Sequence, residues 1–332
     1  MNKIKGILRR FKHLSFKRMF LQIKMIHKET GKSRIITFFD MLWCFARYNV
    51  GYLDYHVFGF ATKRGKKIRS TYMTVSDNVS MVRRLNNREY YHVFDDKAVF
   101  NEKFDKYLKR EWLYLNENSL EDFKLFIKDK EKIIAKPLDQ CCGRGIDIYS
   151  VKDYDAETLF NSLISQKAYL IEEVVKQHPI MDTLSSSSVN TIRIITILNG
   201  ENVNLVAGCV RMSRNGNIVD NFNSGGLSGI LNINTGKIVT DGYDKFRSTF
   251  KKHPDTGTII NGFEVPMWDD VVNLVVEAAK VVPQIRYVGW DVAISNKYGP
   301  QLIEGNSYPG QDVTQYPKLN LGTYSVMMDA IK

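Results

Sequence analysis

The sequence of 332 residues predicts an α/β (α+β) protein that begins with a basic, mostly helical region. Three observations support this prediction. The excess of positive charge lies in the first 34 residues, short β-type runs alternate with helical segments after about residue 131, and two hairpin signals follow. A composition of 44% hydrophobic and 25% charged residues is typical of a globular protein with two or three packed subdomains.

Residues 1–34 are predicted to form a basic amphipathic helical arm. They contain eleven lysine or arginine residues and one acid, Glu29, and so account for +10 of the net charge of +11. Apolar residues recur among these charges at helical spacing: Ile4, Ile7, Leu8, Phe11, Phe16, Met19, Phe20, Ile23 and Ile26.

Two interpretations of this arm are open. Its apolar face binds an anionic membrane surface or a polyanionic substrate, or it packs on the protein's own core while the lysines are solvated. Nucleic acid is not expected as a partner, because the sequence contains no nucleic-acid-binding motif and no second basic patch.

Several classes of protein are excluded by what the sequence lacks. The best candidate for a membrane span, residues 35–53, is interrupted by Asp40 and Arg47, and the N-terminus lacks the apolar core of a signal peptide. The four cysteines form no CxxC pair and the six histidines no HExxH motif, so neither a disulfide framework nor a zinc site is expected. We therefore expect a cytoplasmic protein, placed on the inner face of the membrane if the arm binds lipid.

Residues 35–130 are expected to form an accessory helical region. Within it, residues 100–127 predict two helices with a break at about 116–119, and Ser119 followed by Asp122 has the pattern of a capping box. The strongly basic, turn-like segment 62–70 suggests no chemistry.

Strand signals begin after residue 131. Runs at 132–137, 147–151 and 168–175 are of β type, with a helix predicted at about 155–166. Runs at 190–197 and 203–212 flank Asn199-Gly200 and predict a hairpin, a helix is predicted at about 268–281, and 286–294 with 300–306 predict a second hairpin.

The second hairpin suggests a metal site. Its turn centre near residues 297 and 298 places Asp291 opposite Glu304, and Asn306 shares the face of Glu304 because side chains alternate along a strand. Three oxygen ligands would then converge, as a hard cation such as magnesium prefers. The alternative is a solvated hairpin that carries two exposed acids.

A loop rich in small residues follows Lys136. The segment DQCCGRGIDIYS could cradle phosphates through main-chain N–H groups, or it could be a plain turn between strands. It is neither a Walker loop nor a Rossmann fingerprint.

Two arginines, Arg193 and Arg211, lie in β-type runs that are otherwise apolar. A buried guanidinium needs an anionic partner, which is either a structural acid or a transferring phosphate. Whether both arginines face the same side depends on the hairpin register and stays open. Gly225 and Gly226 allow either a close approach to a ligand or a simple turn.

Taken in order, these segments resemble the ATP-grasp superfamily, and more narrowly the sugar-transfer-associated and teichuronopeptide-synthesis-like ATP-grasp proteins of bacterial surface-polysaccharide biosynthesis. The resemblance covers about residues 100–320 and rests on IIAKP with CCGRGI, YLIEEVV, SSSVNTIRIITI, GCVRM, VDNFNSGGLSG, and GWDVAI with PQLIEGNSYPG. It implies two lobes that hold a nucleotide between two sheets, with the small lobe at 131–180 and the large lobe, with its metal and phosphate site, at 181–332.

The resemblance also implies roles for single residues. The implied nucleotide-binding residues are Lys103, Lys136, Gly143, Arg144, Gly145, Glu172, Glu173, Val174 and Val175. The two lysines would contact phosphates, the glycine loop would cover them, and residues 172–175 would hold adenine and ribose. The implied magnesium ligands are Asp291, Glu304 and Asn306. Arg193 and Arg211 would act on the transferring phosphate, and Asn221, Gly225 and Gly226 would face the acceptor.

The implied function is an ATP-dependent carboxylate–amine ligase that works through an acyl phosphate. Its cofactors would be ATP and magnesium, with two metal ions and manganese as a substitute. One substrate would be a saccharide or lipid-linked saccharide, so that an amide forms on a cell-surface or capsule precursor. Two alternatives stay open: a kinase that phosphorylates an alcohol, and a non-catalytic nucleotide-binding or polysaccharide-binding protein.

Overall fold

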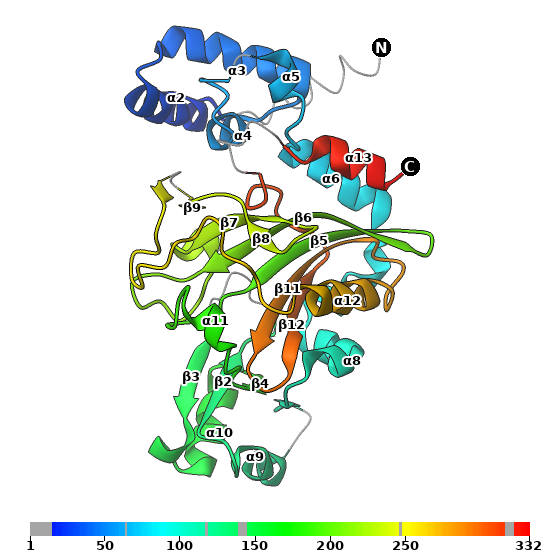
Figure 1. Cartoon of the computed structure of the whole chain (residues 1–332). Helices are drawn as coiled ribbons and strands as arrows, with labels where there is room; N and C mark the ends of the chain where they lie inside the picture. Colours follow the sequence, from blue (N-terminus) through cyan, green and yellow to red (C-terminus); the bar gives the residue numbers. More distant parts are fainter. Residues whose placement is uncertain (1–14, 64, 117–118, 139–144, 246–247, 316–321) are drawn as a thin grey trace. The chain divides into compact units, whose positions relative to one another are not determined.

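The computed structural model of the chain describes residues 15–63, 65–116, 119–138, 145–245, 248–315 and 322–332. The chain divides into two compact units, the first of residues 1–84 with 310–332 and the second of residues 85–309 (Figure 1). This grouping assigns residues 85–130 to the unit that contains the sheets, and it assigns the C-terminal residues to the N-terminal helices. No helix among the described residues is both long and apolar enough to cross a bilayer.

The first unit is helical. It contains α2 (Phe16–Thr30), α3 (Arg34–Tyr48), α4 (Tyr52–Val57), α5 (Lys66–Arg69), α6 (Val75–Leu85) and α13 (Tyr324–Ala330). Helix α2 begins at Ser15, whose side chain accepts a hydrogen bond from the amide of Arg18, and it ends at Gly31, whose φ of 68° suits glycine.

The apolar stripe predicted for the arm divides between two environments in α2. Met19, Ile23 and Ile26 are buried in the core of the first unit, as the packing interpretation expected. Phe16 and Phe20 are exposed. The earlier members of the stripe, at positions 4–11, lie outside the described residues.

The basic segment 62–70 supplies a buried charge to the first unit. Arg69 donates to both carboxylate oxygens of Asp40, at 2.8 and 2.5 Å, and to the carbonyl of Phe60 at 2.7 Å. Tyr55 donates to the same carboxylate at 2.6 Å. These contacts tie α3, α4 and α5 together, so Arg69 has a structural role.

The second unit contains two sheets. The smaller has the strand order β1 (Trp112–Tyr114), β4 (Leu170–Glu173), β2 (Lys132–Lys136) and β3 (Asp147–Ser150). Helices α9 (Leu120–Ile127) and α10 (Ala156–Ser165) contribute to its core. The capping box of Ser119 and Asp122 is present at the start of α9. Strand β1 lies where the sequence predicted helix, so the prediction of two helices over residues 100–127 is wrong at 112–114. Three residues carry too little periodicity to indicate a strand.

The larger sheet carries most of the core of the second unit. Its strands, in spatial order, are β10 (Thr249–Phe250), β9 (Gly242–Tyr243), β7 (Leu227–Asn232), β6 (Asn202–Met212), β5 (Ile192–Asn199), β11 (Tyr287–Ser295) and β12 (Gly299–Asn306), with β8 (Lys237–Ile238) paired to β7. Helices α12 (Trp268–Ala279), α8 (Lys97–Leu108) and α7 (His92–Asp95) pack against this sheet. The remaining short helices are η1 (Arg88–Tyr90), η2 (Val151–Asp153), α11 (Pro179–Asp182) and η3 (Phe222–Ser224).

The C-terminal hairpin has the predicted pairing but an unexpected register. From Ser295↔Gly299 to Val292↔Leu302 the strands pair around Lys297, a register that would set Asp291 opposite Ile303. A β-bulge between Asp291 and Val292 shifts the register by one residue, so that Asp291 pairs with Glu304.

Candidate functional site

A cavity of about 560 Å³ lies in the second unit and is lined by residues of both sheets. The smaller sheet contributes side chains of β2, β3 and β4, and the larger sheet contributes side chains of β6, β11 and β12. A volume of several hundred Å³ is typical of small-molecule sites.

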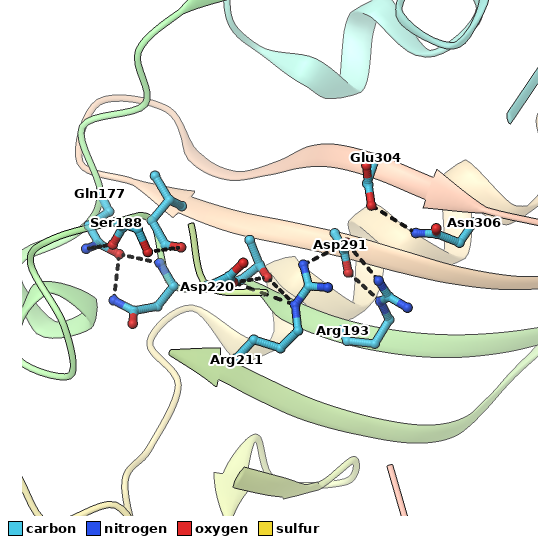
Figure 2. Close-up of polar contacts among 11 residues, drawn as sticks. Gln177, Ser188, Arg193, Arg211, Asp220, Asp291, Glu304 and Asn306 are labelled. Carbon is cyan, nitrogen blue, oxygen red and sulfur yellow. Dashed lines mark hydrogen bonds and ion pairs between the residues drawn. The ribbon is translucent and has the colours of Figure 1, made fainter. Parts of the chain in front are cut away.

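A buried carboxylate that two arginines hold lies in one wall of this cavity (Figure 2). Asp291 is fully buried, with a relative exposure of 0%. Arg193 donates to both of its oxygens, through Nε to one and through Nη2 to the other at 2.9 Å. Arg211 donates to the second oxygen at 2.8 Å. Burial by itself raises the pKa of Asp291, but the two guanidinium groups outweigh it and lower this pKa to about 2.

The strand register explains why both arginines reach one acid. Arg193 pairs with Asp291 on one side and with Cys209 on the other. Arg211 is two residues beyond Cys209 on β6, so its side chain lies on the same face. Both arginines therefore lie on the same face of the sheet, which the sequence had left open. Only Arg211 lines the cavity, and Arg193 lies behind Asp291.

Glu304 and Asn306 lie beside this cluster on β12. Glu304 lines the cavity, and the Asn306 amide donates to its carboxylate at 3.2 Å. Burial raises the pKa of Glu304, and the neighbouring carboxylate of Asp291 raises it further. Two acids held this close favour a cation between or beside them.

The residue set fits magnesium in its chemistry. Magnesium is usually bound by one or two carboxylates, with waters and substrate phosphates as its other ligands. Glu304 can supply oxygens from the cavity wall, and Asn306 lies next to it on β12 within hydrogen-bond distance. Both oxygens of Asp291 already accept hydrogen bonds from arginines, so it is the most constrained of the three. No group of three His, Cys, Asp or Glu side chains suited to a metal occurs in the part of the chain that the structure describes.

A second buried cluster surrounds Glu172 on β4. Lys136 donates to it at 2.5 Å, Arg110 at 2.9 and 3.1 Å, and Asn101 at 2.9 Å. Although burial opposes ionisation, Arg110 and Lys136 lower the pKa of Glu172 well below its usual range. Glu172 lines the cavity, and its predicted contact with the nucleotide stays a prediction. Its carboxylate already accepts these hydrogen bonds and holds Lys136 at the cavity wall.

Arg110 was missed by the sequence reasoning. Besides Glu172 it donates to the main-chain carbonyls of Leu302 at 2.5 Å and Ile303 at 3.4 Å. It therefore connects a strand of the smaller sheet to β12 of the larger one, next to Glu304. Nothing in the sequence around Arg110 indicates these distant partners.

Lys103 lies away from this cavity, contrary to the prediction. Its neighbours are Tyr90, Val99 and Pro283, which line a separate cavity. Lys97, at the start of α8, lines the main cavity instead and donates to the carbonyl of Leu138 at 3.1 Å. Positions six residues apart lie about 120° apart around a helix, so α8 does not direct both side chains to the same place.

The structure gives the glycine pair after Asn221 a packing role, and its position facing the acceptor stays a prediction. Asn221 lines the cavity, but Gly225 and Gly226 do not. A Cβ at Gly226 would lie 2.5 Å from the carbonyl oxygen of Asp220, so the glycine permits a close approach of main chain to main chain. Arg214 binds the carbonyl of Gly225 at 2.6 Å and fixes the loop.

The remaining predicted residues fall into two groups. Glu173, Val174 and Val175 line the cavity at the end of β4. Gly145 is exposed, with a φ of 67°, and Gly143 and Arg144 lie outside the described residues.

A hydrogen-bonded loop of serines closes one side of the cavity (Figure 2). Gln177 donates to the carbonyls of Ser185 and Ser188 at 2.8 and 3.1 Å and accepts from the amide of Asn190 at 3.0 Å. The sequence did not suggest a role for this segment. Its contacts fix residues 185–190 just before β5 begins.

Comparisons with known proteins gave a family match and a set of similar solved structures. A family model described as sugar-transfer associated ATP-grasp matches residues 76–320. This match confirms the resemblance and the predicted fold class. A search of curated proteins gave no match.

Similar solved structures include the ATP-grasp ligase PsnB complexed with minimal precursor, Mg and ADP, at 13% identity and a TM-score of 0.41, covering 76% of this chain and 63% of that chain. A second is L-amino acid ligase from Bacillus licheniformis, at 11% identity and a TM-score of 0.41, covering 67% of this chain and 42% of that chain. A third is D-alanyl-alanine synthetase A from Vibrio cholerae, at 12% identity and a TM-score of 0.41, covering 72% of this chain and 60% of that chain. The chain spans less than two thirds of the length of each of these proteins.

Proposed function

Because the chain belongs to the sugar-transfer associated ATP-grasp family, we propose that it is an ATP-dependent carboxylate–amine ligase that works through an acyl phosphate. The observation that carries the proposal is that Asp291, Glu304, Arg211 and Lys136 line one cavity. Arg193 pairs with Asp291 on the neighbouring strand and holds its carboxylate. Such an arrangement suits a polyphosphate with its cation.

The nucleotide would bind between the two sheets. Glu173, Val174 and Val175 would hold the adenine and ribose, with main-chain groups and one acid available at the end of β4. Lys136, oriented by Glu172, and Lys97 would bind phosphate oxygens. Lys97 takes the place that the sequence gave to Lys103.

Magnesium, for which we propose two ions, would be held by Glu304 and Asn306 with Asp291 as the third ligand. When bound it neutralises phosphate charge. The protein's own part is to orient Glu304, whose carboxylate accepts a hydrogen bond from the Asn306 amide.

The chemistry would take two steps. A carboxylate oxygen of the substrate forms a bond to the γ-phosphorus while the bond to the β-phosphate oxygen breaks, which releases ADP. The amine nitrogen then bonds to the acyl carbon, phosphate leaves with the C–O bond electrons, and the amine loses a proton. Arg211 would stabilise the charge on the transferring phosphoryl group, while Arg193 orients Asp291 behind it.

For the substrates we propose a sugar acid or an amino acid as the carboxylate and a cell-surface polysaccharide precursor as one partner. The family's description as sugar-transfer associated supports this choice. Asp220 and Asn221 line the cavity beyond Arg211 and would face the acceptor.

Hydroxylamine trapping tests the proposal without knowledge of the amine. Candidate carboxylates are incubated with the protein, ATP, magnesium and hydroxylamine, and hydroxamate, ADP and phosphate are measured. A ligase gives hydroxamate in proportion to ADP. A phosphorylated alcohol without hydroxamate would instead identify a kinase, and nucleotide binding without turnover across sugar acids and amino acids would indicate a binding protein.

A further inference from the structure

An apolar face is exposed on the first two described helices of the first unit. Eight large apolar side chains of α2 and α3 are between 44% and 70% exposed: Phe16, Phe20, Leu21, Met25, Ile35, Ile36, Phe39 and Trp43. We call this set the α2–α3 face. Single exposed apolar residues are ordinary, but eight of them on two helices that pack against each other indicate a binding surface.

The α3 part of this face is a continuous stripe. Ile35, Ile36, Phe39 and Trp43 lie within about 100° around the helix axis, because successive residues turn by about 100°. Phe20 of α2 stacks on Phe38 of α3 with ring centroids 5.8 Å apart, which joins the two helices along the face. The opposite side of α3 holds the core residues Met41 and Cys44, so the exposed stripe is not needed for the core of this unit.

Positive charges surround the apolar stripe. Seven exposed cations belong to α2, α3 and the turn between them: Lys17, Arg18, Lys24, Lys28, Lys32, Arg34 and Arg47. The acids of these helices are both paired, since Glu29 contacts His56 at 3.0 Å and Asp40 contacts Arg69. The sequence before α2 adds five more lysines or arginines and no acid. An anionic surface is therefore the complement of this face.

We propose that the α2–α3 face binds an anionic lipid bilayer, with the Ile35, Phe39 and Trp43 stripe inserted at the headgroup level and the surrounding lysines and arginines near lipid phosphates. Aromatic and aliphatic side chains flanked by cations are the composition of interfacial helices. A soluble polyanion would use the cations but would leave the apolar stripe in water. The inference extends the earlier expectation for residues 1–34 to α3, which contributes the more exposed apolar residues.

Vesicle binding of the full chain tests this proposal. Co-sedimentation is measured with phosphatidylcholine vesicles, with and without phosphatidylglycerol, at low and high salt and without nucleotide. We expect binding only to the anionic vesicles, and weaker binding at high salt. The double substitution Ile35→Ser with Phe39→Ser should weaken binding by about tenfold or more.

A matched control distinguishes binding through the α2–α3 face from non-specific adsorption of any exposed apolar residue. Leu125 is as exposed as Ile35, at 70%, but lies on α9 of the second unit, so Leu125→Ser should bind vesicles like the unchanged chain. Brominated lipids should quench fluorescence in the unchanged chain and much less in Trp43→Phe. Hydroxamate formation with soluble substrates should be equal in all these variants, which separates this proposal from the ligase assignment.

Three outcomes would overturn the inference. They are absence of binding to anionic vesicles, unchanged binding after the double substitution, and equal losses in the Leu125→Ser control. Concentration-dependent dimerisation that the double substitution abolishes, without vesicle binding, would show that a second copy of the chain covers this face.

Discussion

Arg110 connects the two sheets through Glu172: its Nε lies 2.9 Å from the Glu172 carboxylate on β4, and its Nη1 lies 2.5 Å from the carbonyl oxygen of Leu302 on β12. Because Glu172 also binds Lys136, one side chain links the lysine proposed for phosphate binding to the strand that carries Glu304. The spacing between the two sheets at the cavity is therefore controlled by a buried charge.

Arg110→Met should destabilise the second unit by about 3 kcal/mol, because it removes one partner of a buried ion pair. It should also raise the KM for ATP, since Glu172 would no longer be held by Arg110 and would position Lys136 less well. Urea unfolding and initial rates measure the two effects. Arg88→Met, at an exposed position of η1, is the control. Unchanged unfolding and KM in Arg110→Met would show that the link is dispensable.

Glu304→Gln should reduce magnesium-dependent turnover by about a thousandfold or more, because the amide is a poorer ligand and carries no charge. The fold should be retained, as Glu304 has no ion pair shorter than 4 Å among the described residues. ADP release at saturating magnesium and thermal unfolding provide the measurements. Glu264→Gln, which breaks an exposed ion pair with Lys237, should leave turnover unchanged. Normal ADP release from Glu304→Gln would remove the metal assignment.

The two arginines should differ in their effects. Arg211→Met should lower kcat by about a hundredfold, because Arg211 lines the cavity and would face the transferring charge. Arg193→Met should mainly reduce stability, since it removes the bidentate partner of the fully buried Asp291. Comparing kcat with the free energy of unfolding for both variants separates the roles. Equal losses of both quantities in the two variants would contradict this division.

The positions of Lys97 and Lys103 can be tested as a pair. Lys97→Met should raise the KM for ATP by about tenfold, whereas Lys103→Met should leave it unchanged, because only Lys97 lines the main cavity. Each variant serves as the control for the other, since both lie on α8. A larger effect at Lys103 would restore the role suggested by the sequence resemblance.

The stability of the first unit should depend on Asp54. Burial raises the pKa of this carboxyl from 3.8 to about 6, although it accepts a hydrogen bond from the amide of Val75 at 3.0 Å. The folded form therefore binds the proton more tightly than the unfolded chain. Its stabilising contribution is full below about pH 4 and is lost as the pH rises through about 6.

Asp54→Asn should remove this dependence and stabilise the unit by about 2 kcal/mol at pH 8, since the amide oxygen can still accept from Val75. Urea unfolding at pH 4 and pH 8, with amide exchange over residues 52–78, measures the difference. A variant that is less stable at pH 8 would mean that the ionised carboxylate is favourable.

Local sequence determined the two long β-hairpins of this protein and the start of one helix. Strand alternation and turn residues predicted both long hairpins, and the pattern of Ser119 and Asp122 predicted the start of α9. These features could be predicted because the interacting residues lie within a few positions of one another. The pairing of Asp291 with Glu304 was predicted as well, but it depends on a bulge that the midpoint of the turn does not reveal.

The tertiary structure alone decided what each charged side chain contacts. Arg110 meets Glu172 across 62 positions and Leu302 across 192, and Arg193 meets Asp291 across 98. Such contacts depend on the order of strands in a sheet and on which face of a helix is buried, and neither is encoded within a short window of sequence. For the same physical reason the sequence could not distinguish Lys97 from Lys103, or the buried stripe of α2 from its exposed one.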